Sequence, residues 1–486
     1  MSGLLLIMFI MAGLAASVAA PVICLYLYNY VTYMAPHTVF YGPGMTLPLA
    51  MITGAAALVV WAAFDRKIFT HLSWCFYLLI VWLIWVCVTF QFYQGDSYNA
   101  HFKFDYATKI LAFSLLAILM LHTRRRIEGF IVILCVTVGF YVGRGLVVTA
   151  LTGGGGLSVT GNKSTPLGDR NYFATVVWML IPMLLWLAQH SVLFPRGRLL
   201  KLGVFGFIAA GLMTIVGTQS RGAMLGAPIF FGFMFLQTKR KLTMLLAAAV
   251  LVAGGLALAP AEWYERMNTI QEYEEDKSAN SRFNSWTFAW EFALQNPVLG
   301  GGFRIFTLNV DPIENRWLDA HSIYFEVLAE HGFPGLALFL LILAAIFMNG
   351  RYLARICKPH PELAWAGDLG HKLTISITLY AACGALLSLA FHPILYDFFA
   401  VSVALRHLVH RHIAAKKAGM AAGVGHSPDG KNPADGSVQA RAPDPRALSW
   451  RERRELKLLR EKAQNDRRRR AQSPPATPEG SDAPRT

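Results

Sequence analysis

Four arginines in this sequence could together bind a phosphorylated group. Arg170, Arg221, Arg282 and Arg304 each stand in a short polar segment that also contains glycine or serine. A guanidinium is planar and stays charged at any relevant pH, so several of them on one face suit bidentate binding of a diphosphate. A single one of them could instead form a local ion pair or extend toward the membrane surface. Arg304 is the weakest of these phosphate-binding candidates.

His321 is the candidate for proton transfer. It opens a predicted helix that runs through Glu330 toward a Phe-Pro-Gly sequence, and either Asp319 or Ser322 could cap that helix. A histidine there could act as a general base toward a hydroxyl group, because its pKa lies near neutral pH. The N-terminus of the helix would also favour a departing anion. The alternative is that His321 only forms hydrogen bonds with nearby backbone.

Between these candidates lies an aromatic stretch, 281–295, with large apolar side chains at helical spacing, namely Phe283, Trp286, Trp290 and Leu294. The pattern predicts a helix lying along a membrane interface, where it would serve as an anchor. Three glycines at 300–302 follow Asn296-Pro297 and predict a flexible turn that brings the chain back toward Arg304.

The elements that position these residues must be membrane helices. Hydrophobic residues make up 55% of the 486-residue chain, charged residues 15%, and the mean hydropathy is +0.42. Apolar runs of about 17 to 25 residues can cross a hydrocarbon core as helices. We therefore predict an all-α polytopic membrane protein of about twelve transmembrane helices, near 4–33, 46–63, 72–91, 106–121, 128–150, 172–190, 202–217, 221–237, 242–258, 333–349, 372–391 and 396–410.

The basic residues of the short loops predict the orientation. They fall in alternate loops, at Arg66-Lys67, Arg124–Arg126, Arg196–Lys201, Lys239–Lys241 and Arg351–Lys358. By the positive-inside rule these loops are cytoplasmic, so twelve spans put both termini inside and the candidate residues on the outer face of the membrane, which in a bacterial inner membrane is the periplasmic face. The first run, 4–33, is predicted to be a single retained anchor helix rather than a signal peptide.

The chain is expected to divide into four parts. Residues 1–258 hold nine transmembrane helices, 259–332 form a long periplasmic loop that includes the start of the catalytic helix, and 333–412 hold three more helices. Residues 413–486 form a basic tail of about +7, predicted to be disordered and cytoplasmic and to contact anionic lipids rather than nucleic acid.

Several familiar chemistries have no motif here. The sequence has no P-loop, no HExxH and no Asp-x-Asp pair on the predicted outer face, so we expect no metal, nucleotide or other cofactor. The six cysteines lie in apolar runs or a basic loop without a CxxC pair, which argues against disulfides and a zinc site.

The candidate segments resemble the membrane O-antigen ligase and O-antigen polymerase superfamily. The resemblance rests on Thr218–Gly222, Ser281–Trp286 with Asn296–Gly300, and His321–Gly335, in that order and spacing. Leu167–Ala174 and the Ala20-Pro21 region are most similar to the O-glycosylation ligases associated with exosortase A systems. The resemblance covers roughly residues 1–410.

The resemblance implies an inverting, metal-independent transfer of a glycan from an undecaprenyl-diphosphate carrier to an acceptor hydroxyl. It implies that His321 activates the acceptor and that Arg221 and Arg282 neutralise the leaving diphosphate, with Arg170 as a helper. The acceptor stays open among a glycolipid, a polysaccharide and a protein. A polymerase of the same superfamily is the first alternative, and a lipid-linked sugar transporter is the second.

Overall fold

The structure is a computed structural model that describes residues 2–39, 47–65, 73–152, 159–238, 277–310 and 317–423, with a few further positions between 241 and 249. By contacts the chain divides into two units, Met1–Gly419 and Met420–Thr486, and all that follows concerns the first. The predicted tail lies outside the described residues from 424 onward. The predicted span 242–258 lies almost entirely outside them.

The described residues form helices and no strands, with one isolated bridge between Val310 and Trp317. The helices are α1 (Ser2–Ala19), α2 (Val22–Met34), α3 (Pro36–Val39), α4 (Leu49–Phe64), α5 (Trp74–Phe90), α6 (Ser97–Met120), α7 (Arg124–Thr152), α8 (Arg170–His190), α9 (Arg198–Gly217), α10 (Arg221–Met224), α11 (Gly226–Gln237), α14 (Lys277–Gln295), α15 (Ile323–Ile356), α16 (Ala364–Gly384) and α17 (Pro393–Gly423), with short 3-10 turns η1 (Ile305–Leu308) and η2 (Pro361–Leu363).

Four of the described helices are long and apolar enough to cross a membrane, namely those at Arg124–Leu151, Arg170–His190, Arg198–Gly217 and Ile323–Ile356. Shorter apolar helices lie at Gly3–Ala19, Leu49–Phe64, Trp74–Phe90 and Gly222–Gln237. These findings confirm the expected class, an all-α membrane protein. The number of twelve spans stays a prediction.

The first apolar run is not one helix, as the sequence suggested, but two. Helix α1 ends at Ala19 and α2 begins at Val22, because Pro21 has no backbone N–H to continue the helix. The two helices form a hairpin in which Phe9 lies edge-on to Tyr30, with ring centroids 5.6 Å apart. The argument that put both termini inside counted this stretch as one span, so it no longer fixes the side of the N-terminus.

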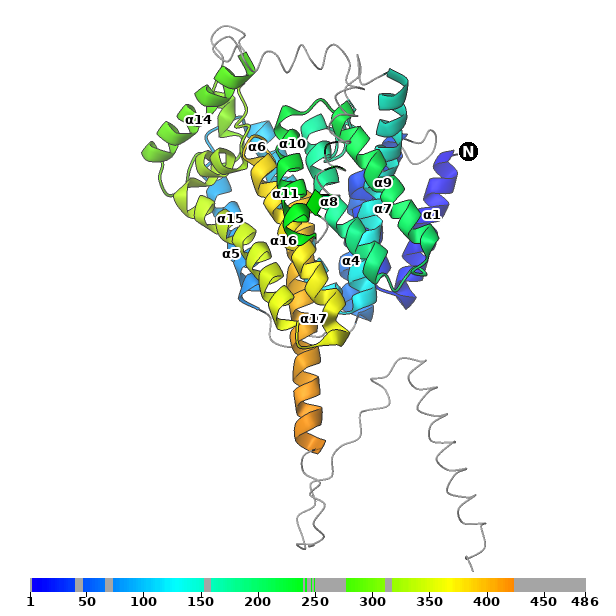
Figure 1. The fold of residues 1–486 in the computed structure, drawn as a ribbon. Coiled ribbons are helices and arrows are strands. Elements are labelled where there is room, and N and C mark those ends of the chain that lie inside the picture. Colours follow the sequence, from blue (N-terminus) through cyan, green and yellow to red (C-terminus); the bar gives the residue numbers. More distant parts are fainter. Residues whose placement is uncertain are drawn as a thin grey trace, which may run out of the picture. The chain divides into compact units, whose positions relative to one another are not determined.

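Helix α8 lies in the middle of the bundle (Figure 1). It packs against α16, α9 and α7, and α15 packs against α16 and α5. Polar groups tie the apolar helices together: Trp186 donates to the carbonyl of Trp365 at 2.8 Å, and Ser376 donates to that of Met179 at 2.7 Å. Because lipid is as apolar as the helix surfaces, such bonds and close packing hold a membrane bundle together.

The basic residues Arg124–Arg126, expected in a loop, form the first turn of α7 at one end of this bundle. The Arg126 guanidinium makes two hydrogen bonds of 2.9 Å to the carboxylate of Asp65, and Arg124 donates to the carbonyl of His190 at the C-terminus of α8. At its N-terminus, the opposite end, α8 begins with Arg170, one of the candidate site residues. The basic residues and the candidate site therefore lie at opposite ends of the same helix.

Candidate active site

A cavity of about 480 Å³ opens at the end of the bundle where α8 begins. A second cavity of about 150 Å³ shares five of its wall residues, namely Lys103, Tyr172, Arg304, Glu326 and Ser388. The walls come from the start of α6, the segment before α8, the start of α15 and the loop between α16 and α17. Parts of the chain more than 200 residues apart in sequence thus meet at one polar pocket.

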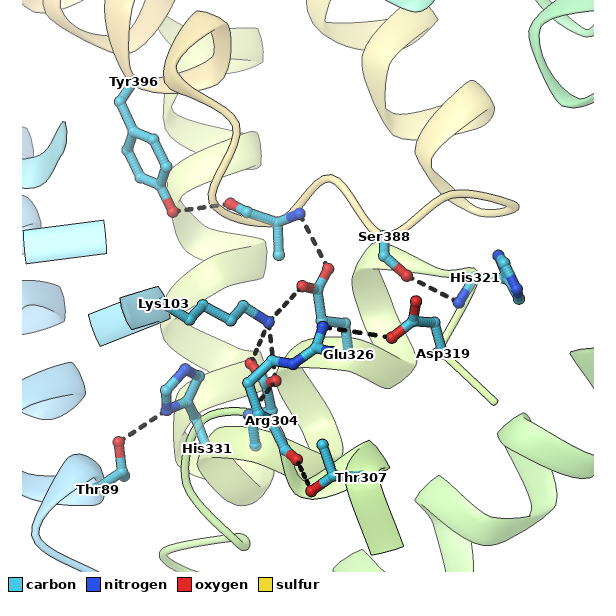
Figure 2. A network of polar contacts seen from close by, with 12 residues as sticks. Thr89, Lys103, Arg304, Thr307, Asp319, His321, Glu326, His331, Ser388 and Tyr396 are labelled. Atoms are coloured by element: carbon cyan, nitrogen blue, oxygen red, sulfur yellow. Dashed lines mark hydrogen bonds and ion pairs between the residues drawn. The ribbon is translucent and has the colours of Figure 1, made fainter. Parts of the chain in front are cut away.

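Arg304, one of the predicted arginines, lines both cavities. Its guanidinium approaches Asp319, with 3.4 Å between Nη1 and Oδ1 (Figure 2). Its Nε is buried and has no hydrogen-bond partner among the described residues. The Arg304 backbone is left-handed, with φ of 63°, and it is held there because its N–H donates to Glu330 at 2.8 Å and its carbonyl accepts from Thr307. The side chain therefore retains donors for a ligand while its backbone is fixed.

The three glycines before Arg304 form a turn, as predicted, but a fixed one rather than a flexible one. The N–H groups of Gly301 and Gly302 donate to the carbonyls of Ala329 and Glu330 at 2.8 and 2.9 Å. Gly302 has a φ of +69°, and a Cβ there would lie 2.5 Å from the Cα of Tyr93. Only glycine allows the chain to pass so close to its neighbours in that conformation.

His321 lies directly before α15. Its backbone is also left-handed, with φ of 47°, and its N–H donates to the Ser388 hydroxyl at 2.9 Å. The preceding carbonyl, that of Ala320, accepts from the indole of Trp286 at 3.0 Å, which ties α14 to this segment. Figure 2 shows the imidazole turned away from Lys103, beyond Ser388. Asp319 and Ala320 line the smaller cavity, so His321 lies beside the pocket rather than in its wall.

Of the two residues offered as helix caps, Ser322 takes the N-cap position of α15, although its side chain makes no capping hydrogen bond. Asp319 instead interacts with Arg304. The predicted continuation of the helix is confirmed: α15 runs from Ile323 past a break at Gly332 to Ile356.

Backbone strain is concentrated in the segments that the sequence singled out. Four non-glycine residues have positive φ in the described parts of the chain: Ala35, Gln219, Arg304 and His321. The last two are candidate site residues, and Gln219 lies two positions before the candidate Arg221. Such conformations cost about 1–3 kcal/mol each and collect at functional sites, where the surrounding structure holds them. The coincidence favours a functional role for these three segments.

Of the other three candidate arginines, Arg170 and Arg282 are not among the described residues that line either cavity. Arg170 is the first residue of α8, between Asp169 and Tyr172, which do line the larger cavity. Arg282 lies on α14, one turn before Trp286. Arg221 begins α10, which packs against α8 and α16, and its side chain lies outside the described residues. The roles of all five candidate site residues stay predictions.

Sequence reasoning missed a cluster of charged side chains at the pocket, formed by Lys103, Glu326 and Glu330. The ammonium of Lys103 lies 2.7 Å from Glu326 and 2.7 Å from Glu330 (Figure 2), and these carboxylates are almost fully buried. A signal existed. Lys103 stands just before an apolar run, and the two glutamates are four residues apart, on one face of a helix. The rule that a charge at a membrane helix needs a partner singles out each of these three residues, although it does not state which of them pair.

His392 joins two walls of the larger cavity. Its Nε2 lies 3.0 Å from the carbonyl oxygen of Pro166, so this nitrogen carries the proton, and Nδ1 accepts from the N–H of Ile394 at 3.3 Å. Burial lowers the pKa of the imidazole to about 4. In the neutral form both ring nitrogens have hydrogen-bond partners. A second proton, on Nδ1, would face the N–H of Ile394, which is also a donor.

We therefore expect the protein to lose stability as the pH falls from 7 toward 4, partly through His392. Its pKa is lower in the folded state than its ordinary 6.5, so the unfolded chain binds the proton more tightly over this range. The difference amounts to about 3 kcal/mol of unfolding free energy at pH 4. Thermal unfolding in detergent at several pH values measures it. His392→Gln should show a smaller loss than the wild type, and an equal loss in both would contradict the assignment.

The comparisons with known proteins match two parts of the chain. Residues 1–192 match a family described as Family of unknown function (DUF5935). Residues 205–340 match a family described as O-Antigen ligase. This match supports the O-antigen ligase superfamily. It covers Arg221, Arg282, Arg304 and His321, and the function that it supports is of the membrane glycan ligase or polymerase type, with a lipid-linked glycan as substrate. No curated protein matches the chain.

Proposed function

We propose that this protein transfers a glycan from an undecaprenyl-diphosphate carrier to an acceptor hydroxyl at the periplasmic face of a bacterial inner membrane. The observation that carries the proposal is the meeting of Arg304 and the His321 segment at one polar cavity, within the residues that match the O-antigen ligases. The narrower assignment, to ligases associated with exosortase A systems, rests only on the resemblance of Leu167–Ala174 and of the Ala20-Pro21 region.

The proposed reaction is a single displacement. The acceptor hydroxyl gives its proton to the His321 imidazole while its oxygen attacks the anomeric carbon of the donor sugar. The bond between that carbon and the phosphate oxygen breaks, and the electron pair leaves with the lipid diphosphate, so the configuration inverts. Arg304, Arg282, Arg221 and Arg170 are the groups that would neutralise the leaving diphosphate. This chemistry calls on side chains of the protein without a metal or a nucleotide.

The periplasmic location of the site is supported by its position relative to the basic loops. Arg124–Arg126 contact the C-terminus of α8, while the cavity opens at the N-terminus of the same helix. Because basic loops remain on the cytoplasmic side, the cavity would face the periplasm. Lipid-linked donors are exposed on that face, where the acceptor, whether glycolipid, polysaccharide or protein, would meet them.

Reconstitution of the purified protein tests the function. In nanodiscs with an undecaprenyl-diphosphate glycan and each class of acceptor in turn, we expect one acceptor to gain the glycan in the presence of EDTA and without nucleotide. The measurement is product formation by mass spectrometry, and the anomeric configuration of the product by NMR should be inverted. A donor left intact with every acceptor would contradict the proposal.

A polymerase of the same superfamily would perform the same bond chemistry, with a second lipid-linked chain as acceptor. Glycan analysis of a deletion strain separates the two. Polymer of normal length retained on its carrier indicates a ligase, whereas loss of polymer length indicates a polymerase.

A further inference from the structure

The ammonium of Lys103 has no hydrogen-bond donor left for a substrate. Its Nζ lies 2.7 Å from Oε1 of Glu326, and 2.8 and 2.7 Å from Oε1 and Oε2 of Glu330. An ammonium has three N–H groups, and the three carboxylate oxygens account for all of them. The Lys103 side chain is 17% exposed, and those of Glu326 and Glu330 are 6% and 1% exposed. Although Lys103 lines both cavities, its ammonium is fully occupied by the two glutamates and is therefore not available to bind a phosphate.

Each of the two carboxylates also holds a loop of the candidate site. Oε1 of Glu330 accepts from the backbone N–H of Arg304 at 2.8 Å. Oε2 of Glu326 accepts from the N–H of Ala390 at 3.1 Å, and the carbonyl of Ala390 in turn accepts from the Tyr396 hydroxyl at 3.0 Å. One loop carries the guanidinium that enters the pocket, and the other carries Ser388.

Ser388 extends this network to the candidate base. Its hydroxyl accepts from the backbone N–H of His321 at 2.9 Å. Ser388 lies two residues before Ala390, whose N–H donates to Glu326. Figure 2 shows Lys103, Glu326 and Arg304 close together, with Ser388 and its hydrogen bond to His321 nearby. Both Arg304 and His321 have left-handed backbones, which persist only where neighbouring groups hold them.

We propose that Lys103 is a positioning residue for the transfer reaction, acting through Glu326 and Glu330 on the backbones of Arg304 and His321. The inference rests on the proposed function. Its physical basis is that two buried carboxylates, four residues apart on one helix, keep their charge and their geometry only beside a cation. Without the ammonium they repel each other, and the two loops lose their anchors.

Hydrogen–deuterium exchange in Lys103→Met tests the network without any assay of activity. We expect peptides covering 300–308 and 385–392 to exchange at least about 10-fold faster than in the wild type, because the N–H groups of Arg304 and Ala390 lose ordered acceptors. Peptides from α9 should not change. Lys109→Met is the matched control, since Lys109 is an exposed lysine of the same helix, paired with Asp105, and should alter neither loop. Unchanged exchange in both loops, or equal acceleration throughout the chain, would overturn the proposal.

Should Lys103→Met fail to fold, the double variant Lys103→Met, Glu326→Gln serves in its place. It leaves one buried carboxylate instead of two and keeps an oxygen that can accept from Ala390. In this variant the 300–308 peptides should still exchange faster than in the wild type. The 385–392 peptides should exchange more slowly than in Lys103→Met, Glu326→Ala, a double variant that has lost the acceptor for the Ala390 N–H. Equal exchange of 385–392 in these two double variants would count against the role of Glu326.

A double-mutant cycle connects the network with the reaction. We expect Lys103→Met to lower kcat about 100-fold with the KM for the lipid-linked donor nearly unchanged, since misplaced groups cost rate rather than binding. In combination with Arg304→Ala the further loss should be well below 100-fold, because part of the effect passes through Arg304. Independent, multiplicative losses would overturn the positioning role. Absence of transfer by the wild type would refute the proposed function. The hydrogen–deuterium exchange of the two loops would still test the positioning role of Lys103, because it does not depend on activity.

Discussion

Replacing His321 by asparagine is expected to lower the rate of glycan transfer by about 100- to 10,000-fold, the range that a positioned general base contributes to a proton-transfer step. The acceptor hydroxyl is a weak nucleophile, and its attack on the anomeric carbon requires a group that takes its proton. Asparagine tolerates the left-handed backbone that the structure gives this position, so the variant removes the base with little added strain. Single-turnover transfer in nanodiscs gives the rate of the chemical step.

The control for this prediction is His101→Asn. His101 lies on α6 at the same end of the molecule, with an exposed side chain whose Nδ1 lies 2.7 Å from the carbonyl oxygen of Ser97, and it lines neither cavity. Its replacement should leave the transfer rate within about twofold, as surface substitutions usually do. A wild-type rate in His321→Asn, equal to that of the control, would contradict the prediction. The base would then have to be another group of the pocket.

The segments that contain Arg304 and His321 could be singled out from the sequence because their polar residues interrupt a chain of long apolar runs. Arg304 and His321 lie in polar segments between long apolar runs, and a charge near a membrane helix needs a partner. The helices at Leu49–Phe64 and Trp74–Phe90 follow from their apolar runs in the same direct way. Local pattern and local structure agree in these places because the bilayer requires every spanning segment to satisfy its own backbone.

The contacts between distant segments were not accessible. Lys103 meets Glu326 across 223 residues, and no local pattern states which of several cations a buried glutamate will face. The break at Pro21 was misjudged for a different reason: hydropathy alone runs smoothly through it, and only the missing N–H of proline ends the helix. Likewise the glycines at 300–302 read as flexible, whereas contacts with Tyr93 and α15 fix them.

Replacing Gly332 by alanine is expected to lower the free energy of unfolding by about 4 kcal/mol, the sum of backbone strain and overpacking. Gly332 breaks α15 with a φ of 69° and a ψ of −174°, a conformation essentially restricted to glycine. A Cβ there would clash with the carbonyl oxygen of Val298 and lie 2.6 Å from its carbon. These are backbone atoms of the turn that leads to Arg304, so they cannot turn aside as a side chain could.

The break also sets the direction of the first part of α15, which carries Glu326 and Glu330 toward Lys103, so transfer activity should fall together with stability. Thermal unfolding in detergent measures the first effect. Gly203→Ala is the matched control, because Gly203 lies on α9 with nothing within 4 Å of an added Cβ, and alanine there should be neutral or slightly stabilising. Equal unfolding temperatures for the two variants would mean that the turn at Val298 yields to a methyl group, and the Arg304 backbone would then not be held as rigidly as its contacts indicate.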